Sequence, residues 1–158
     1  MKMRVMYATK KHKMVTYAEA IGAANGCIVN DIPPAYPADK ERLVLIGLTM
    51  KDEPEDRVRR FCSELKPDKA TYTALFIDGE PGTEAEDQVK EILKEAGTYV
   101  LEETYYVNTG RFNFSKKISL QERQHIVDWS RKMQNWVIAL NGKAPTTKTF
   151  EPEDKKEE

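Results

Sequence analysis

RLVLIGL, at residues 42–48, is the most apolar segment of the chain. Its apolar residues follow one another without the alternation seen in a strand that has one face in water. Such a run is typical of a strand that is covered on both faces inside a parallel sheet. We therefore predict that this segment is the central strand of an α/β domain.

Four more segments have the apolar, β-branched and aromatic composition of strands, at residues 4–8, 27–30, 71–78 and 98–107. The last of them is the longest and carries Glu102, Glu103 and Thr104 in its middle. This polarity suits an edge of a sheet better than its centre. We expect residues 98–107 to form one uninterrupted edge strand.

Helical spacing of apolar residues predicts four helices between and after these strands. Their boundaries are Asn25-Gly26 after the first, Pro54 and Pro67 around the second, Thr83 and Gly97 around the third, and Ser119 and Asn141-Gly142 around the fourth. Thr83 with Glu86, and Ser119 with Glu122, have the spacing of capping boxes. Trp129 and Trp136 lie on the apolar face of the last helix and are expected to pack against the sheet.

Proline residues interrupt the connection between the second and third strands. Pro33, Pro34 and Pro37 exclude a regular helix there, so we expect a loop or a single turn. Since no short hairpin joins the strands, the sheet is predicted to be parallel, with right-handed crossovers. Of two strand orders that fit, 2-1-3-4-5 is preferred, because it places the apolar third strand at the centre and the polar fifth at an edge.

Length and charge narrow the class of protein. A chain of 158 residues with 40% hydrophobic and 32% charged residues fits one globular domain. We assign the domain to residues 1–142 and expect residues 143–158, whose only aromatic is Phe150, to be a solvated charged tail. The net charge of -1 indicates no attraction to nucleic acid or to a membrane surface. No signal segment or membrane span is found, so a cytoplasmic location is expected.

Metal-ligating residues are few and scattered. Cys27 and Cys62 form no CxxC pair and are expected to be buried thiols in a reducing compartment. His12 and His125 have no partner at ligand spacing, and His125 is expected at the surface. We predict no metal site.

The loop after the first strand carries the most informative motif. Thr9-Lys10-Lys11-His12-Lys13-Met14 follows the strand and precedes a helix, as the phosphate loop S/T-x-T-G-x-T does in the flavodoxin family. On this alignment, which covers residues 1 to about 141, the chain resembles short-chain flavodoxins with an altered flavin site. Only Thr9 matches the pattern, because Lys11 and Met14 replace threonines and His12 replaces the glycine. Hydroxyls and amides at a helix N-terminus normally hold the phosphate, and here lysines replace most of them.

Two further loops follow the third and fourth strands. In the family these loops lie along the flavin ring and supply a stacking aromatic. Here the corresponding residues are Thr49, Met50 and Lys51 after the third strand, and Gly79, Glu80 and Gly82 after the fourth. Neither loop contains an aromatic residue, so Phe112 and Phe114, before the last helix, are the nearest stacking candidates.

The resemblance implies binding of flavin mononucleotide (FMN), electron transfer and a redox or regulatory protein partner. The implied binding residues are Thr9, Lys10, Lys11, His12, Lys13 and Met14 around the phosphate, and the six loop residues named above along the ring. The alternative is a flavin-free domain of the same fold, whose basic loop meets another anion or a protein partner. For both hypotheses, Lys11 and Lys13 are expected to be exposed. If neither hypothesis holds, the basic residues 10–13 form an ordinary solvated loop.

Other classes of function have less support. No nucleophile–base pair or carboxylate pair is present, so an electron carrier or a non-catalytic domain is favoured over a hydrolytic or transfer enzyme. A response-regulator receiver needs acidic residues after the first strand, where Thr9 and Lys10 stand. A dinucleotide-binding domain needs G-x-G-x-x-G at the same place, and no glycine occurs there.

Overall fold

The computed structural model describes residues 1–110 and 117–146. The strands are β1 (Met3–Ala8), β2 (Ile28–Asp31), β3 (Glu41–Thr49), β4 (Ala70–Asp78), β5 (Tyr99–Val100) and β6 (Tyr105–Val107). The helices are α1 (His12–Asn25), α2 (Asp56–Ser63), α3 (Glu84–Ala96) and α4 (Leu120–Leu140). None of these helices is long and apolar enough to cross a bilayer.

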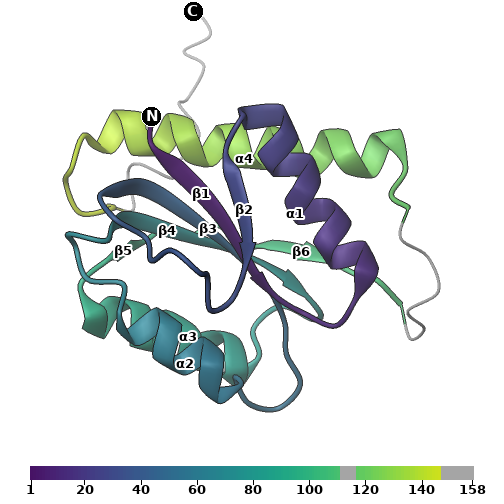
Figure 1. Cartoon of the computed structure of the whole chain (residues 1–158), viewed down its shortest axis with the longest axis horizontal. Helices are drawn as coiled ribbons and strands as arrows, with labels where there is room; N and C mark the ends of the chain where they lie inside the picture. Colours follow the sequence, from purple (N-terminus) through teal and green to yellow (C-terminus); the bar gives the residue numbers. More distant parts are fainter. Residues whose placement is uncertain (111–116, 147–158) are drawn as a thin grey trace, which may run out of the picture.

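The strands form one parallel sheet in the order β2-β1-β3-β4-β5, with β6 also bonded to β4. This confirms the predicted order and the central place of the apolar segment in β3. Helices α1 and α4 cover one face of the sheet, and α2 and α3 cover the other (Figure 1). The result is a three-layer sandwich of the α/β class that the sequence predicted.

The last strand is interrupted, and the expectation of one continuous strand over residues 98–107 was wrong. Val100 pairs with Thr73 of β4, and Tyr105 pairs with Phe76. Between these two pairs, β4 contains only residues 74–75, whereas the last strand contains residues 101–104. The extra residues of the last strand have no partners in β4, so they leave the hydrogen-bonded ladder. Polar Glu103 in this segment turns to α4, where its carbonyl accepts from the Trp129 indole at 3.2 Å.

Two apolar clusters fill the sandwich, one on each face of the sheet. Trp129 of α4 is buried in the first cluster and Trp136 is half-buried against it, as predicted. Cys62 of α2 is buried in the second, and burial raises the pKa of its thiol to about 12. Cys27 is only half-buried, because it lies just before the edge strand β2.

The helix caps follow the sequence with one exception. Ser119 and Glu122 form a complete capping box at α4, and Gly26 ends α1 in the left-handed conformation. At α3, the Thr83 hydroxyl accepts from the Glu86 amide at 3.2 Å, but Glu86 does not return the bond. The Glu86 carboxylate instead accepts from the Tyr106 hydroxyl at 2.6 Å and pairs with Lys90 at 2.7 Å. The predicted capping box of Thr83 with Glu86 was therefore wrong.

The connection from β2 to β3 contains no helix, as its prolines predicted. Ile32 and Ala38 are buried in this connection and cover the sheet where a crossover helix would normally lie. The face that carries α2 and α3 is therefore covered by two helices and this loop.

A buried hydroxyl links the sheet to the chain beyond α4. Tyr72 of β4 is fully buried, and its hydroxyl donates to the Lys143 carbonyl at 2.6 Å. The domain boundary at Gly142 stays a prediction, and the hydrogen bond places Lys143 against the domain. Residues 147–158, including Phe150, lie outside the described part of the chain.

We predict that a chain ending at Thr146 keeps its full stability, whereas one ending at Gly142 loses about 1–2 kcal/mol, because a buried hydroxyl loses its acceptor. Chemical denaturation of both truncated chains measures the difference. In a Tyr72→Phe background the two truncations should have equal stability, since no hydroxyl remains to be satisfied. A loss of stability in the Tyr72→Phe background as large as in the wild type would contradict this role for Lys143.

Candidate functional site

Three loops that were predicted to form one site meet at the carboxyl edge of the sheet. They are residues 9–11 after β1, residues 50–55 after β3 and residues 79–83 after β4. β1 lies between β2 and β3, so the chain leaves β1 and β3 in opposite directions at this edge. This is the switch point at which open parallel sheets usually bind their ligands.

Hydroxyl groups from two of these strand ends contact each other. Thr9 Oγ1 lies 2.7 Å from Thr49 Oγ1, and Thr49 donates to Asp78 Oδ2 at 3.2 Å. On the other side Thr109, two residues after β6, donates its hydroxyl to Asp78 Oδ2 at 2.7 Å and its amide to Oδ1 at 3.0 Å. These four residues form a polar chain across the ends of β1, β3, β4 and β6.

The direction of the hydrogen bonds follows from proton accounting. A threonine hydroxyl has one proton to donate. Thr49 gives its proton to Asp78, so Thr9 must be the donor in the Thr9–Thr49 pair. Thr9 Oγ1 also accepts from the Lys11 amide at 3.0 Å. In this arrangement Thr9 donates to Thr49, and Thr49 and Thr109 both donate to Asp78, so none of these three hydroxyl protons is left for a phosphate oxygen.

The basic loop is shorter than the phosphate-loop pattern implies. Helix α1 begins at His12, so His12, Lys13 and Met14 belong to its first turn. Met14 is fully buried between the sheet and α4, and its side chain therefore lies in the core. Lys10 and His12 are exposed. Lys11 is half-buried and donates from Nζ to the Gly110 carbonyl at 3.1 Å.

An ion pair joins the start of α1 to the start of α4. Lys13 Nζ lies 3.0 Å from Glu122 Oε2, with 22% of the Lys13 side chain exposed. The expectation that Lys11 and Lys13 are freely exposed was wrong, because both side chains bond to residues that follow the last strand. Glu122 also accepts from the Tyr17 hydroxyl. The bonds from Tyr17, the Ser119 amide and Lys13 together lower the pKa of Glu122 to about 2.

The residues that were predicted to lie along the flavin ring belong to the end of β3 and to two loops of the same edge. Met50 is half-buried and packs toward the α2 face, and Lys51 is exposed. Gly79, Glu80 and Gly82 are exposed, and the Gly79 amide donates to the Val107 carbonyl at 3.0 Å. Phe112 and Phe114, the proposed stacking residues, lie outside the described residues.

Sequence reasoning missed the residues that complete this edge. Asp78 was treated only as the end of a strand, although a carboxylate at the carboxyl end of a parallel strand is a signal of a polar edge. Thr109 and Tyr17 gave no signal, and Glu122 was predicted only as a capping residue, because the partners in these contacts lie 31 and 105 residues apart in the sequence. In residues 1–110 and 117–146, no cluster of His, Cys, Asp or Glu could hold a metal ion.

Comparisons with known proteins identify the fold. No protein-family model and no curated protein matches the sequence. Among solved structures, an archaeal flavodoxin superposes with a TM-score of 0.60 and 14% identity, over 87% of this chain and 99% of that one. Flavodoxin 2 from Bacillus cereus gives 0.60 and 11%, over 85% and 99%. A Streptococcus pneumoniae TIGR4 flavodoxin gives 0.63 and 8%, over 85% and 99%.

The chain is therefore an α/β protein with a flavodoxin-like fold. The likeness extends over nearly the whole length of those flavodoxins. At these identities it establishes the arrangement of strands and helices and leaves the chemistry of the edge to be argued from this chain's own residues.

We predict that Glu122 makes stability depend on pH between about pH 4.5 and pH 2. Its folded pKa lies below the ordinary value of 4.5, so the carboxylate stabilises the fold fully above that pH. This stabilisation is lost as the pH falls toward 2. Glu122→Gln should therefore unfold more easily than wild type at pH 7 and lose less stability between pH 5 and pH 3. Denaturant titrations at the three pH values measure this.

Glu91→Gln is the matched control, because Glu91 is an exposed carboxylate on α3 and its loss leaves the α1–α4 contact in place. Its stability should follow the wild-type pH dependence. Parallel pH curves for wild type and Glu122→Gln would show that the cluster at Glu122 does not stabilise the fold.

Proposed function

We propose that this chain is a flavin-independent binding domain, which uses the flavodoxin-like fold to recognise an anionic group beside the first turn of α1. The observation that carries the proposal is the polar chain Thr9–Thr49–Asp78–Thr109, in which Thr9 donates to Thr49 and both Thr49 and Thr109 donate to Asp78. A phosphate held in the manner of flavodoxins needs hydroxyl donors from this loop. Those donors have acceptors within the protein, and Asp78 adds a carboxylate to the same edge. The residues present therefore do not fit FMN in the family's manner.

Positive charge at the start of α1 supports recognition of an anion. Lys10 is exposed, and Lys11 donates from Nζ to the Gly110 carbonyl. Lys13 is balanced by Glu122 and contributes less. The N-terminus of α1, a helix of 14 residues, adds a partial positive charge in the same place. These groups can attract a small anion or an acidic segment of a partner.

FMN binding and electron transfer form the second candidate function. The likeness to three flavodoxins over most of the chain supports it. In that case residues 9–14 would lie at the phosphate, and Thr49, Met50, Lys51, Gly79, Glu80 and Gly82 along the ring. A redox or regulatory protein would then be the partner, and a cytoplasmic location would suit that role.

We predict that the purified protein is colourless and does not quench FMN fluorescence when it is titrated into the flavin. The physical reason is the missing set of free hydroxyl donors. A flavodoxin titrated under the same conditions serves as the positive control for the assay. Absorption bands of bound oxidised flavin near one equivalent would reject the flavin-independent function and establish the second candidate.

We predict that phosphate raises the thermal midpoint more than chloride does at matched ionic strength. Only the folded chain presents the basic loop, so phosphate at about ten times its dissociation constant should shift the midpoint by about 2–5 °C. The double replacement Lys10→Ala, Lys11→Ala should abolish the difference between the anions.

The matched control is Lys66→Ala with Lys94→Ala, which removes the same charge from exposed positions after α2 and on α3. This variant should keep the wild-type response to phosphate. Equal shifts in both double variants would assign the effect to general salt stabilisation and remove the anion site at the basic loop.

A further inference from the structure

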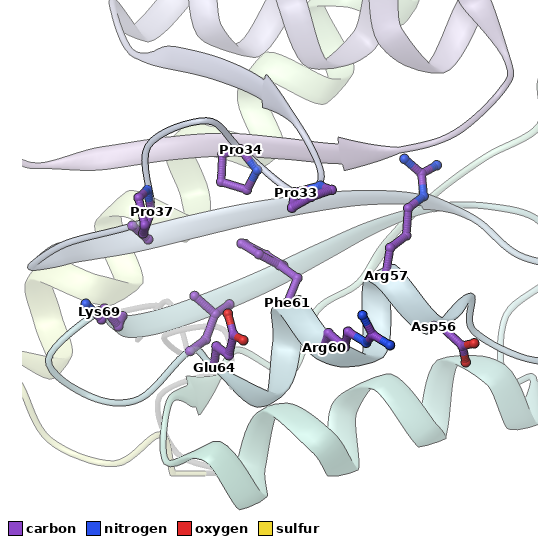
Figure 2. Close-up of a pocket in the computed structure, with 11 residues that line it drawn as sticks. Pro33, Pro34, Pro37, Asp56, Arg57, Arg60, Phe61, Glu64 and Lys69 are labelled. Atoms are coloured by element: carbon purple, nitrogen blue, oxygen red, sulfur yellow. The ribbon is translucent and has the colours of Figure 1, made fainter.

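A pocket of about 500 Å³ lies on the face of the sheet that carries α2 and α3, between α2 and the helix-free connection from β2 to β3 (Figure 2). Its walls are mainly apolar, and they are formed by Pro33, Pro34, Pro37 and Ala38 of the connection with Phe61 and Leu65. Figure 2 shows the Phe61 side chain projecting from α2 toward the proline-bearing connection. The volume is typical of a small-molecule site.

The pocket exists because the connection has no helix. A crossover between parallel strands usually places a helix on the sheet. Here the prolines exclude one, and residues 32–40 cover the sheet with only a thin layer of chain. The space beside α2 is therefore left open to solvent.

Two arginines hold the connection in place through its backbone carbonyls. Arg57 of α2 donates to the Ile32 carbonyl at 2.8 Å, and Arg4 of β1 donates to the Tyr36 carbonyl at 2.7 Å. The proline rings add local stiffness, because they fix the backbone angle φ. The pocket walls are thus anchored from both sides, and a ligand would meet a preformed cavity, which lowers the entropy lost on binding.

The charges around the pocket balance one another. Arg57 is compensated by Asp31 at 3.3 Å and by Glu55 at 2.8 Å, and neither of these carboxylates lines the pocket.

Four charged residues remain in the lining, two of each sign. Arg60 and Lys69 are the cations, and Asp56 and Glu64 are the carboxylates. Their fields largely cancel, so charge complementarity favours a ligand with no net charge.

We propose that this pocket binds a neutral, ring-containing small molecule, which packs its apolar body between Phe61 and the prolines of residues 33–37. Ring-shaped walls favour a flat apolar body, because aromatic and proline rings offer broad contact surfaces. The volume of about 500 Å³ lies within the range of small-molecule sites, so the pocket suits a small molecule. The site is separate from the basic loop at the carboxyl edge.

The test uses the neutral probe N-phenyl-1-naphthylamine, whose fluorescence rises when it leaves water, with the full chain. It should bind saturably at one site. Amide chemical-shift changes in NMR spectra should map to residues 35, 36 and 38, the non-proline positions of the connection, and to residues 57–65, with residues 9–13 unaffected. Phe61→Leu should weaken binding by about three- to tenfold, because an aromatic contact is lost. The matched control Trp136→Leu removes an aromatic from the other face of the sheet and should leave binding unchanged.

Three outcomes would overturn the proposal. The first is that the probe shows no saturable binding, and the second is that the shift changes map elsewhere, including to the basic loop. The third uses 1-anilinonaphthalene-8-sulfonate, which shares the rings and adds a negative charge. Tighter binding of this anion than of the neutral probe would reject a neutral ligand. If Phe61→Leu fails to fold, the shift map of the wild-type protein decides alone.

Discussion

The parallel pairing of β3 with β4 is the constraint on which the rest of the structure depends. Residues 43–48 of β3 and 72–77 of β4 are buried on both faces, so each face of the sheet must be covered. Parallel strands cannot be joined by hairpins, and their crossovers supply the covering layers. The same geometry brings the carboxyl ends of the strands to one edge, where their loops meet. The parallel packing of the central strands therefore determines at which edge of the sheet a ligand could bind.

At that edge, Asp78 determines what the hydroxyl groups can do. A hydroxyl in a partly buried place needs an acceptor, and a ligand phosphate can supply one only if the protein does not. Asp78 accepts from Thr49 and Thr109, and through Thr49 it also orients Thr9. A protein can thus have the flavodoxin-like fold while the hydroxyl groups at the carboxyl edge of its sheet donate to acceptors within the protein. The fold alone therefore does not determine which cofactor a protein binds.

Local signals predicted the strands, the helices and the strand order. Apolar runs indicate which segments are buried, and the prolines and Gly26 indicate which conformations the backbone can adopt. The break in the last strand was not predictable, because it depends on a length mismatch against β4. Glu86 has the spacing of a capping box, yet Tyr106, brought close by the fold, competes for its carboxylate. A local pattern indicates which partners a side chain could bond to. The tertiary structure determines which of those partners it actually contacts.

The same reasoning explains why the basic loop was harder to interpret than the fold. Thr9 to Lys13 could be placed at the switch point from sequence, since only the order of the strands is needed. Whether a lysine there faces solvent depends on what lies opposite, and Glu122 and Gly110 come from the far end of the chain. A run of four basic residues therefore overstates the positive charge at this edge, because Glu122 of α4 balances Lys13.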